Sequence, residues 1–223
     1  MKEVLISIQP KWCELIANGT KTVEVRKTKP KLNTPFKCYI YCTLPPKEEL
    51  LNFGSFREYA NELIRLQDGL IVYDYGMRVC CDIEGRPYSQ DNFLCKKVIG
   101  EFVCDRIDTI RKRGIDDNFD YCYLSLDKWG NDDIESEITA VKNSCVLRDD
   151  LNDYGENSRM LYGWHISNLK IYDNPKALSE FAKPCNYNCF VPCPYYRGKE
   201  YDCEKPVITR PPQSWCYIEG AKE

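Results

Sequence analysis

The chain has 223 residues, of which 43% are hydrophobic, 13% aromatic and 29% charged. This composition is typical of a folded globular protein and excludes a chain that is disordered throughout, because disordered chains have too little apolar surface to bury. The formal net charge is −3, so the protein as a whole does not attract nucleic acid. Any contact with RNA or DNA must therefore come from a local cluster of cations.

The first 26 residues predict a short strand, a helix and a second strand. Alternating isoleucines indicate the first strand, and Pro10 stands where a helix would begin. Gly19 predicts the end of that helix, because glycine readily adopts the left-handed conformation that follows a last turn. The alternation then resumes, which places Glu24 and Arg26 on one face of the second strand, about 7 Å apart.

Lys21 lies at the predicted joint between helix and strand, where an irregular backbone can turn its side chain toward Glu24 and Arg26. The three groups would then form a polar binding site at one end of a sheet. The alternative is a solvated lysine and an exposed strand face, on which cross-paired charges contribute only a few tenths of a kcal/mol. Spacing alone leaves both interpretations open.

A basic cluster surrounds this strand, with five cations within eleven residues: Lys21, Arg26, Lys27, Lys29 and Lys31. The planar fork of Arg26 suits a phosphate or a base edge, whereas Lys27 and Lys29 supply point charges. An internal pair between Arg26 and Glu24 is an equal alternative. Both can hold if the pair orients the guanidinium.

The N-terminal segment resembles the signature of the ASCH family, a branch of the PUA-like β-barrels. The residues that carry the resemblance are Gly19-x-Lys21-x-x-Glu24-x-Arg26, preceded by Ile8-x-Pro10-Lys11-Trp12. Segments 98–104 and 162–175 resemble later parts of the family in the same order. Segments 178–181 and 210–215 are similar to the tail of phage-associated and gut-bacterial members. The resemblance covers roughly half of the chain.

The resemblance implies an α+β protein built on a small, mixed PUA-like β-barrel with helical insertions and a Cys-rich C-terminal segment. We expect residues 1–181 to form the barrel domain, with an insertion at about 45–96, and residues 182–223 to form a Cys-rich extension packed on it. Further elements are expected as strands at 36–43, 98–110 and 163–172, helices at 47–67 and 146–154, and a helical turn at 175–181.

The resemblance also implies a function. Some small ASCH proteins are associated with hydrolysis of an amide on a modified nucleoside through a lysine, a threonine and a glutamate, and others are linked to RNA cleavage. Lys21 matches that lysine by position, but the threonine position is Glu24, and a carboxylate cannot act as the hydroxyl nucleophile. Lys21 and Glu24 are the candidate catalytic pair, with the carboxylate as a general base toward water. Glu101 is a third candidate by vicinity.

We therefore expect an ASCH-type binding module for RNA or a modified nucleoside in a basic cleft. The alternative is a small amidohydrolase or ribonuclease acting on an acylated nucleoside or RNA. A third class, a structural or host-interaction protein of phage origin, has no positive marker in the sequence.

Three rings near the motif segments are further candidates for ligand binding. Trp12 and Trp164 could stack on a nucleobase, and the alternative is that both are core anchors. His165 is the sole histidine, which excludes metal sites that need several. It alternates with Trp164 on the predicted strand and so faces the opposite side. Either it is a hydrogen-bonded structural group, or it stacks or transfers protons opposite Lys21.

The chain has fourteen cysteines but neither a signal-peptide run nor a membrane-length apolar stretch, which predicts a cytoplasmic protein with reduced thiols and no membrane partner. The cysteines that lie in apolar runs should behave as small buried hydrophobes, namely Cys38, Cys42, Cys104 and Cys122.

Four other cysteines form a candidate structural zinc site: Cys185, Cys189, Cys193 and Cys203. Unliganded thiols are an equal alternative there, an iron–sulfur cluster is a third, and Cys216 is a substitute ligand.

Overall fold

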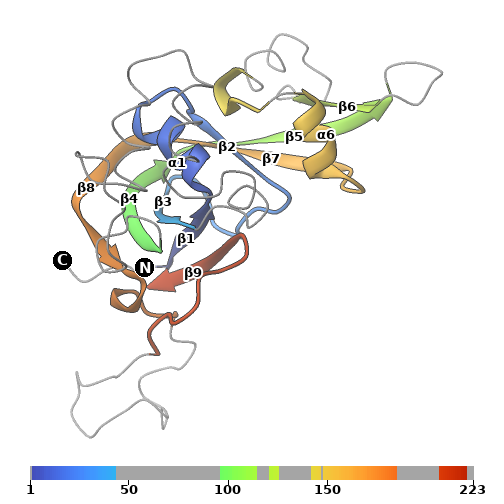
Figure 1. Cartoon of the computed structure of the whole chain (residues 1–223). Helices are drawn as coiled ribbons and strands as arrows, with labels where there is room; N and C mark the ends of the chain where they lie inside the picture. Colours follow the sequence, from blue (N-terminus) through green and yellow to red (C-terminus); the bar gives the residue numbers. More distant parts are fainter. Residues whose placement is uncertain are drawn as a thin grey trace, which may run out of the picture. The chain divides into compact units, whose positions relative to one another are not determined.

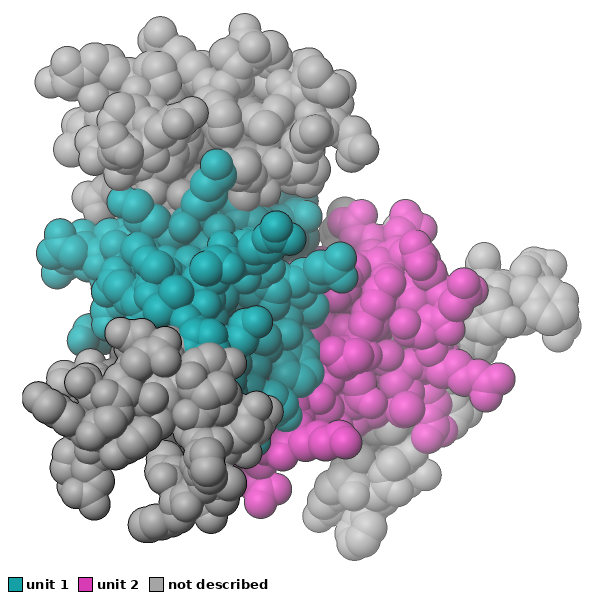
Figure 2. Space-filling view, turned by 90° about the horizontal axis from the view of Figure 1, so that it is seen from below, with its two compact units in different colours: residues 1–13, 37–101, 170–223 teal, residues 14–36, 102–169 magenta. Residues whose placement is uncertain are grey.

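The computed structural model describes residues 2–43, 96–114, 121–125, 142–146, 148–184 and 206–219. The predicted insertion, with its helix at 47–67, lies outside these residues, as does most of the Cys-rich extension. The chain divides into two compact units, which Figure 2 colours separately. Unit 1 comprises residues 1–13, 37–101 and 170–223, and unit 2 comprises residues 14–36 and 102–169.

One sheet has five strands in the order β8-β4-β3-β1-β9 (Figure 1). These strands are β1 (Lys2–Ile8), β3 (Phe36–Cys42), β4 (Lys97–Cys104), β8 (Ser167–Ala177) and β9 (Trp215–Glu219). The sheet is mixed, as predicted: β1 pairs in parallel with β3 and antiparallel with β9. The C-terminal strand β9 therefore lies beside the N-terminal strand.

The core of unit 1 forms on this sheet. Consecutive residues of β1, from Val4 to Ile8, are all buried, which is typical of an inner strand whose two faces are both covered. The main cluster consists of Leu5, Tyr39, Tyr41, Val98, Phe181, Ile208 and Ile218. Burying each large apolar side chain stabilises the fold by about 1.5–3 kcal/mol relative to its exposure to water.

Helix α1 (Pro10–Ala17) begins and ends as the sequence predicts. Pro10 occupies its first position, where a missing N–H costs nothing. Gly19 has φ = +79°, and its N–H donates to the carbonyl of Ile16, while the N–H of Lys21 donates to Leu15. These bonds satisfy carbonyls of the last turn. No helix in the described part of the chain is long and apolar enough to cross a membrane.

The second sheet belongs to unit 2 and has four antiparallel strands in the order β2-β7-β5-β6. They are β2 (Val23–Arg26), β5 (Ile107–Gly114), β6 (Tyr121–Ser125) and β7 (Met160–His165). Helix α6 (Arg148–Gly155) packs Leu151 against Val25, Ile110 and Leu161. These contacts make one face of the sheet the core of unit 2.

The described strands form two open sheets, so the closed β-barrel predicted from the family resemblance is not observed in this part of the chain. In this part of the chain strands predominate and helices are few. The predicted strand at 98–110 is interrupted at Asp105 and Arg106, which separates β4 from β5. The predicted strand at 163–172 is likewise two strands, β7 and β8, separated at Ile166.

The helical turn predicted at 175–181 begins later than expected, and only its second half is confirmed. Strand β8 continues through Pro175 to Ala177, and a short 3₁₀ helix over Leu178–Glu180 follows. The physical reason is the position of β8 at the edge of its sheet. A proline is tolerated there, because an edge strand has one row of N–H groups that need no ladder partner.

Candidate functional site

Lys21, Glu24 and Arg26 form a buried network of charges in unit 2. Their exposed fractions are only 2%, 6% and 8%. Lys21 Nζ lies 3.3 Å from Glu24 Oε2, and Arg26 Nη2 lies 2.9 Å from Glu24 Oε1. Each oxygen of the carboxylate therefore contacts a different cation, and the charges of the three groups, two positive and one negative, sum to +1.

The backbone before β2 brings Lys21 into this network. Strict alternation would place Lys21 with Val23, away from Glu24, but β2 begins only at Val23. Lys21 Nζ also donates to the carbonyl of Ser144 at 2.5 Å, and the N–H of Thr22 donates to the carbonyl of Asn143. The described segment 142–146 thus holds the irregular joint in place.

The register of β2 on β7 places the carboxylate and the guanidinium on one face of the sheet. Glu24 lies opposite Trp164, and Arg26 lies opposite Tyr162; residues opposite each other in an antiparallel pair project to the same side. Trp164 is 0% exposed and packs edge-to-face on Phe36, with ring centroids 5.9 Å apart. The structure therefore places Trp164 in the core, as an anchor beneath the charged groups.

Exposed lysines follow the buried network along the chain. Lys27 Nζ lies 3.8 Å from Glu156 Oε2 and 5.2 Å from the centroid of the Tyr154 ring. Lys29 Nζ lies 5.1 Å from the centroid of Tyr162, the half-buried residue opposite Arg26 in the sheet. Such cation–π contacts contribute about 0.5–1 kcal/mol at exposed sites. The predicted basic cluster is thus buried at Lys21 and exposed from Lys27 onward.

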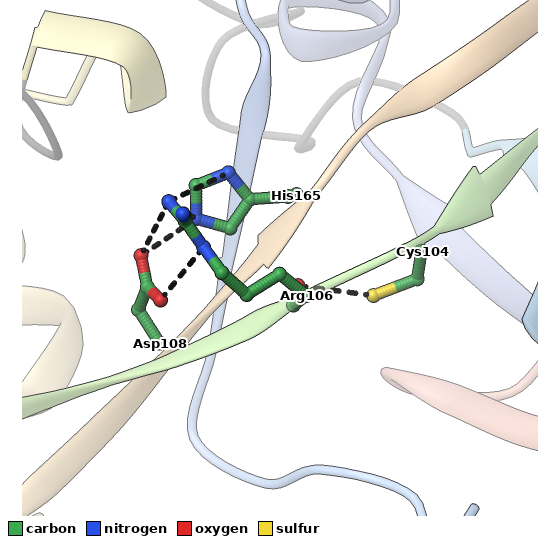
Figure 3. Close-up of polar contacts among 4 residues, drawn as sticks. All are labelled: Cys104, Arg106, Asp108 and His165. Carbon is green, nitrogen blue, oxygen red and sulfur yellow. Dashed lines mark hydrogen bonds and ion pairs between the residues drawn. The ribbon is translucent and has the colours of Figure 1, made fainter. Parts of the chain in front are cut away.

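A second polar cluster in unit 2 joins Arg106, Asp108 and His165 (Figure 3). His165 Nε2 lies 2.6 Å from Asp108 Oδ2, and Arg106 Nε lies 3.1 Å from Asp108 Oδ1. Burial alone would raise the pKa of Asp108, but the hydrogen bond from His165, together with the charge and hydrogen bond of Arg106, outweighs it and holds that pKa below its ordinary value. The carboxylate is therefore the ionised acceptor, and His165 Nε2 carries the proton.

This second cluster lies on the opposite face of the sheet from Glu24 and Arg26. His165 is paired with Val23, and Asp108 is paired with Gly163; both positions alternate with the charged face. The structure therefore does not place His165 opposite Lys21, as one of our hypotheses required. Sequence reasoning missed Asp108 and Arg106, although the charged alternation at the start of β5 was a usable signal.

A buried thiol, that of Cys104, lies next to the second cluster. Cys104 is fully buried, and its Sγ lies 3.4 Å from the carbonyl of Arg106. Burial, followed by the charge of Asp105, raises the pKa of Cys104 to about 12, so the thiolate needed for nucleophilic attack does not form near neutral pH. Cys38 and Cys42 are equally buried thiols, which confirms the prediction that they act as small hydrophobes.

Two candidates from the sequence belong to unit 1. Trp12 is half-buried in α1, and Lys11 Nζ lies 4.6 Å from its ring centroid. Glu101 accepts a hydrogen bond from the hydroxyl of Tyr172 at 2.5 Å and lies 3.4 Å from Lys37 Nζ. Lys21 and Glu24, in contrast, belong to unit 2. Glu101 therefore has its own partners on the five-stranded sheet.

The predicted zinc site falls on Cys185, Cys189, Cys193 and Cys203, which lie outside the described residues, so it stays a prediction. Within the described ranges, no three His, Cys, Asp or Glu side chains are grouped to hold a metal ion. Metal analysis of the purified protein tests the prediction: less than about half an equivalent of zinc or iron would make these cysteines structural thiols.

No protein-family model matches the sequence, and no curated protein matches it. Comparison of the fold does find solved structures. The chain is similar to an ASCH protein from Zymomonas mobilis. That structure is 14% identical to this chain and has a TM-score of 0.47, and the match covers 97% of this chain and 87% of that one. The resemblance predicted from the N-terminal motif is to the same domain.

Structures of two variants of the Zymomonas mobilis protein are also similar. One is 16% identical, with a TM-score of 0.41 and coverage of 80% of this chain and 77% of that chain. The other is 15% identical, with a TM-score of 0.46 and coverage of 97% and 88%.

Proposed function

We propose that this chain is a binding module for RNA or a modified nucleoside, and that its site consists of the Lys21–Glu24–Arg26 network and the exposed lysines that follow it. The observation that supports the proposal is the buried network itself. Two cations contact one carboxylate inside the protein, at the start of a segment whose next lysines reach solvent.

The burial of these charges favours a site over a simple structural bridge. An ion pair inside a protein stabilises the fold little, because the desolvation of both partners offsets their attraction. Such pairs are more useful where a charged group must be held in one orientation. Glu24 fixes the guanidinium of Arg26 at 2.9 Å, so a ligand that contacts Arg26 meets a group whose conformational entropy is already lost.

The residues around Arg26 suit a nucleotide. Tyr162 lies beside Arg26 in the sheet, and Lys29 lies over the Tyr162 ring. Proteins that bind single-stranded nucleic acid combine backbone-tracking cations with aromatic rings on which bases stack. The lysines would contact phosphates, and the ring would contact a base.

RNA affinity measured at two salt concentrations tests this proposal. Each phosphate contact lowers log K by about 0.7 per unit of log[salt] for a single strand. Replacing Lys27 and Lys29 together by Gln should therefore weaken binding and flatten the slope by about 1.4. The matched control is Lys2→Gln, because Lys2 is also an exposed lysine over a tyrosine ring, that of Tyr217 in unit 1. Salt-independent binding, or equal losses in the control, would contradict the proposal.

Hydrolysis is a second candidate, favoured by the 3.3 Å contact between Lys21 Nζ and Glu24 Oε2. In this role Glu24 would accept a proton from water, and Lys21 would stabilise the developing oxyanion. The test is release of free acid from a panel of acylated cytidines. Activity that survives in a folded Lys21→Met variant would reject this assignment, and activity lost with an unchanged melting temperature would support it.

A further inference from the structure

We propose that Arg106 and His165 bind a phosphoryl group and that His165 takes up one proton as it binds. This site would be separate from the one above, because its side chains lie on the opposite face of the four-stranded sheet. The phosphoryl group could belong to free phosphate or to a nucleotide, and the experiment below distinguishes these sources.

Arg106 supplies the first set of donors. Its side chain is 64% exposed, although Nε and Nη2 contact the Asp108 carboxylate at 3.1 and 3.3 Å. Among the described residues, Nη1 has no partner in this cluster. Its two hydrogens are therefore available to an anion, while Asp108 holds the plane of the guanidinium. This is how an arginine is prepared for two-pronged recognition of a phosphate.

His165 supplies the second donor after it is protonated. Because Nε2 donates to Asp108, Nδ1 carries the lone pair of the neutral ring. Arg106 Nη2 lies 2.9 Å from Nε2 and 3.5 Å from Nδ1, so the guanidinium lies across the ring edge (Figure 3). A proton added at Nδ1 would create an N–H beside the guanidinium. The cluster charge would then change from 0 to +1 at the point where the anion arrives.

Two charged groups beside His165 act on this change in opposite directions: the Asp108 carboxylate favours the protonated ring, and the Arg106 guanidinium disfavours it. On β4 the neighbour is the neutral thiol of Cys104, and on β2 the paired residue is the uncharged Val23. The charged side chains that contact His165 are those of Asp108 on β5 and of Arg106 in the loop before it. The side chains of His165 and Asp108 are 21% and 27% exposed, so solvent and a small anion can reach the edge of the cluster.

A phosphoryl group fits this arrangement better than a carboxylate. A phosphate monoester loses its second proton near pH 6, close to the ordinary histidine pKa of about 6.5. A carboxylate is fully ionised there and offers two oxygens in one plane, whereas the phosphoryl group offers three oxygens to Nη1 and Nδ1 together.

Nitrogen NMR of the ¹⁵N-labelled full chain tests the proposal directly, because the chain has one histidine and gives one pair of imidazole signals. Without ligand, Nδ1 should be the unprotonated nitrogen and Nε2 the protonated one. Inorganic phosphate or adenosine monophosphate should then move both nitrogen signals toward those of the protonated ring, since an adjacent anion favours the charged form. Tighter binding of adenosine monophosphate than of inorganic phosphate would identify a nucleotide site, and equal binding of the two would identify a phosphate site.

Two arginine variants distinguish direct phosphate binding by Arg106 from a general effect of removing one positive charge. Arg106→Gln should weaken phosphate binding about tenfold, while Arg159→Gln, which removes an exposed arginine of the same unit, should leave it unchanged. Asp108→Asn should populate the other ring tautomer and reduce the phosphate-induced change in the imidazole nitrogen signals. Three results would overturn the proposal: a proton on Nδ1 in the ligand-free protein, an equal shift with acetate or chloride at the same ionic strength, or an equal loss in both arginine variants.

Discussion

The two charged clusters of unit 2 share one sheet and differ in what surrounds them. The network of Lys21, Glu24 and Arg26 is almost completely buried, whereas Arg106 is 64% exposed in its contact with Asp108. The same kinds of groups, a carboxylate with cations at 2.9 to 3.3 Å, are therefore found in two dielectric environments. Attraction between charges and the cost of removing a partner both grow as water is excluded.

This difference predicts how each cluster responds to mutation. In the buried network, every member depends on the others, because a lone charge cannot be hydrated there. In the exposed cluster, water replaces a lost partner at small cost. Stability measurements on matched variants can therefore confirm or refute the contrast without knowledge of any ligand.

The largest effect is expected for Glu24→Gln. This change leaves Lys21 and Arg26 buried without their shared anion, and breaking a buried ion pair costs about 3–5 kcal/mol. Urea unfolding of the variant measures the loss. The matched control is Glu156→Gln, because Glu156 is an exposed carboxylate that contacts Lys27, and it should change stability by less than about 0.5 kcal/mol. Equal losses of stability for the two variants would mean that burial does not determine the cost of removing a paired carboxylate.

A smaller loss is expected for Arg26→Lys. The charge stays, but the planar fork that contacts Glu24 Oε1 is lost, and a lysine cannot reproduce its geometry. We expect a loss of about 1–2 kcal/mol in the free energy of unfolding, the size of one hydrogen bond to a charged group. A variant as stable as the wild type would show that Arg26 acts only as a point charge.

Asp108→Asn should cost about 1 kcal/mol near neutral pH, because its partners are partly solvated. The loss should depend on pH. The folded-state pKa of Asp108 lies below the ordinary aspartate value of 3.8, so its ionised form stabilises the fold above about pH 4. This contribution disappears as pH falls through the folded pKa. Wild type and variant should therefore differ in denaturation midpoint at pH 5 and converge near pH 2. A constant difference over that range would contradict this ionisation scheme.

The smallest effect is expected for Lys27→Gln, at less than about 0.5 kcal/mol, because its contact with Glu156 is exposed and 3.8 Å long. Thermal unfolding measures it. If the same variant weakens RNA binding, Lys27 contributes to binding without contributing to the stability of the fold. A loss above about 1 kcal/mol would show that Lys27 belongs to the structural network and not to its exposed continuation.

Local patterns in the sequence determined the elements around the candidate site. Pro10 and Gly19 predicted the limits of α1, and alternation predicted the shared face of Glu24 and Arg26. Each of these predictions depends on backbone preferences that act over a few residues. The same reasoning failed at Pro175, because edge position is a property of the whole sheet and cannot be read from neighbouring residues.

Only the tertiary structure decided which charges meet and how much water reaches them. Lys21 joins Glu24 because the carbonyl of Ser144, 123 positions later in the chain, accepts a hydrogen bond from Lys21 Nζ. His165 meets Asp108, 57 positions earlier, on the face that Lys21 does not occupy. Pairing between strands fixed these contacts and the burial of each cluster. The sequence by itself therefore determined which charged groups the strand carries, and folding decided their environment, since the dielectric around a charge depends on all the chain segments that surround it.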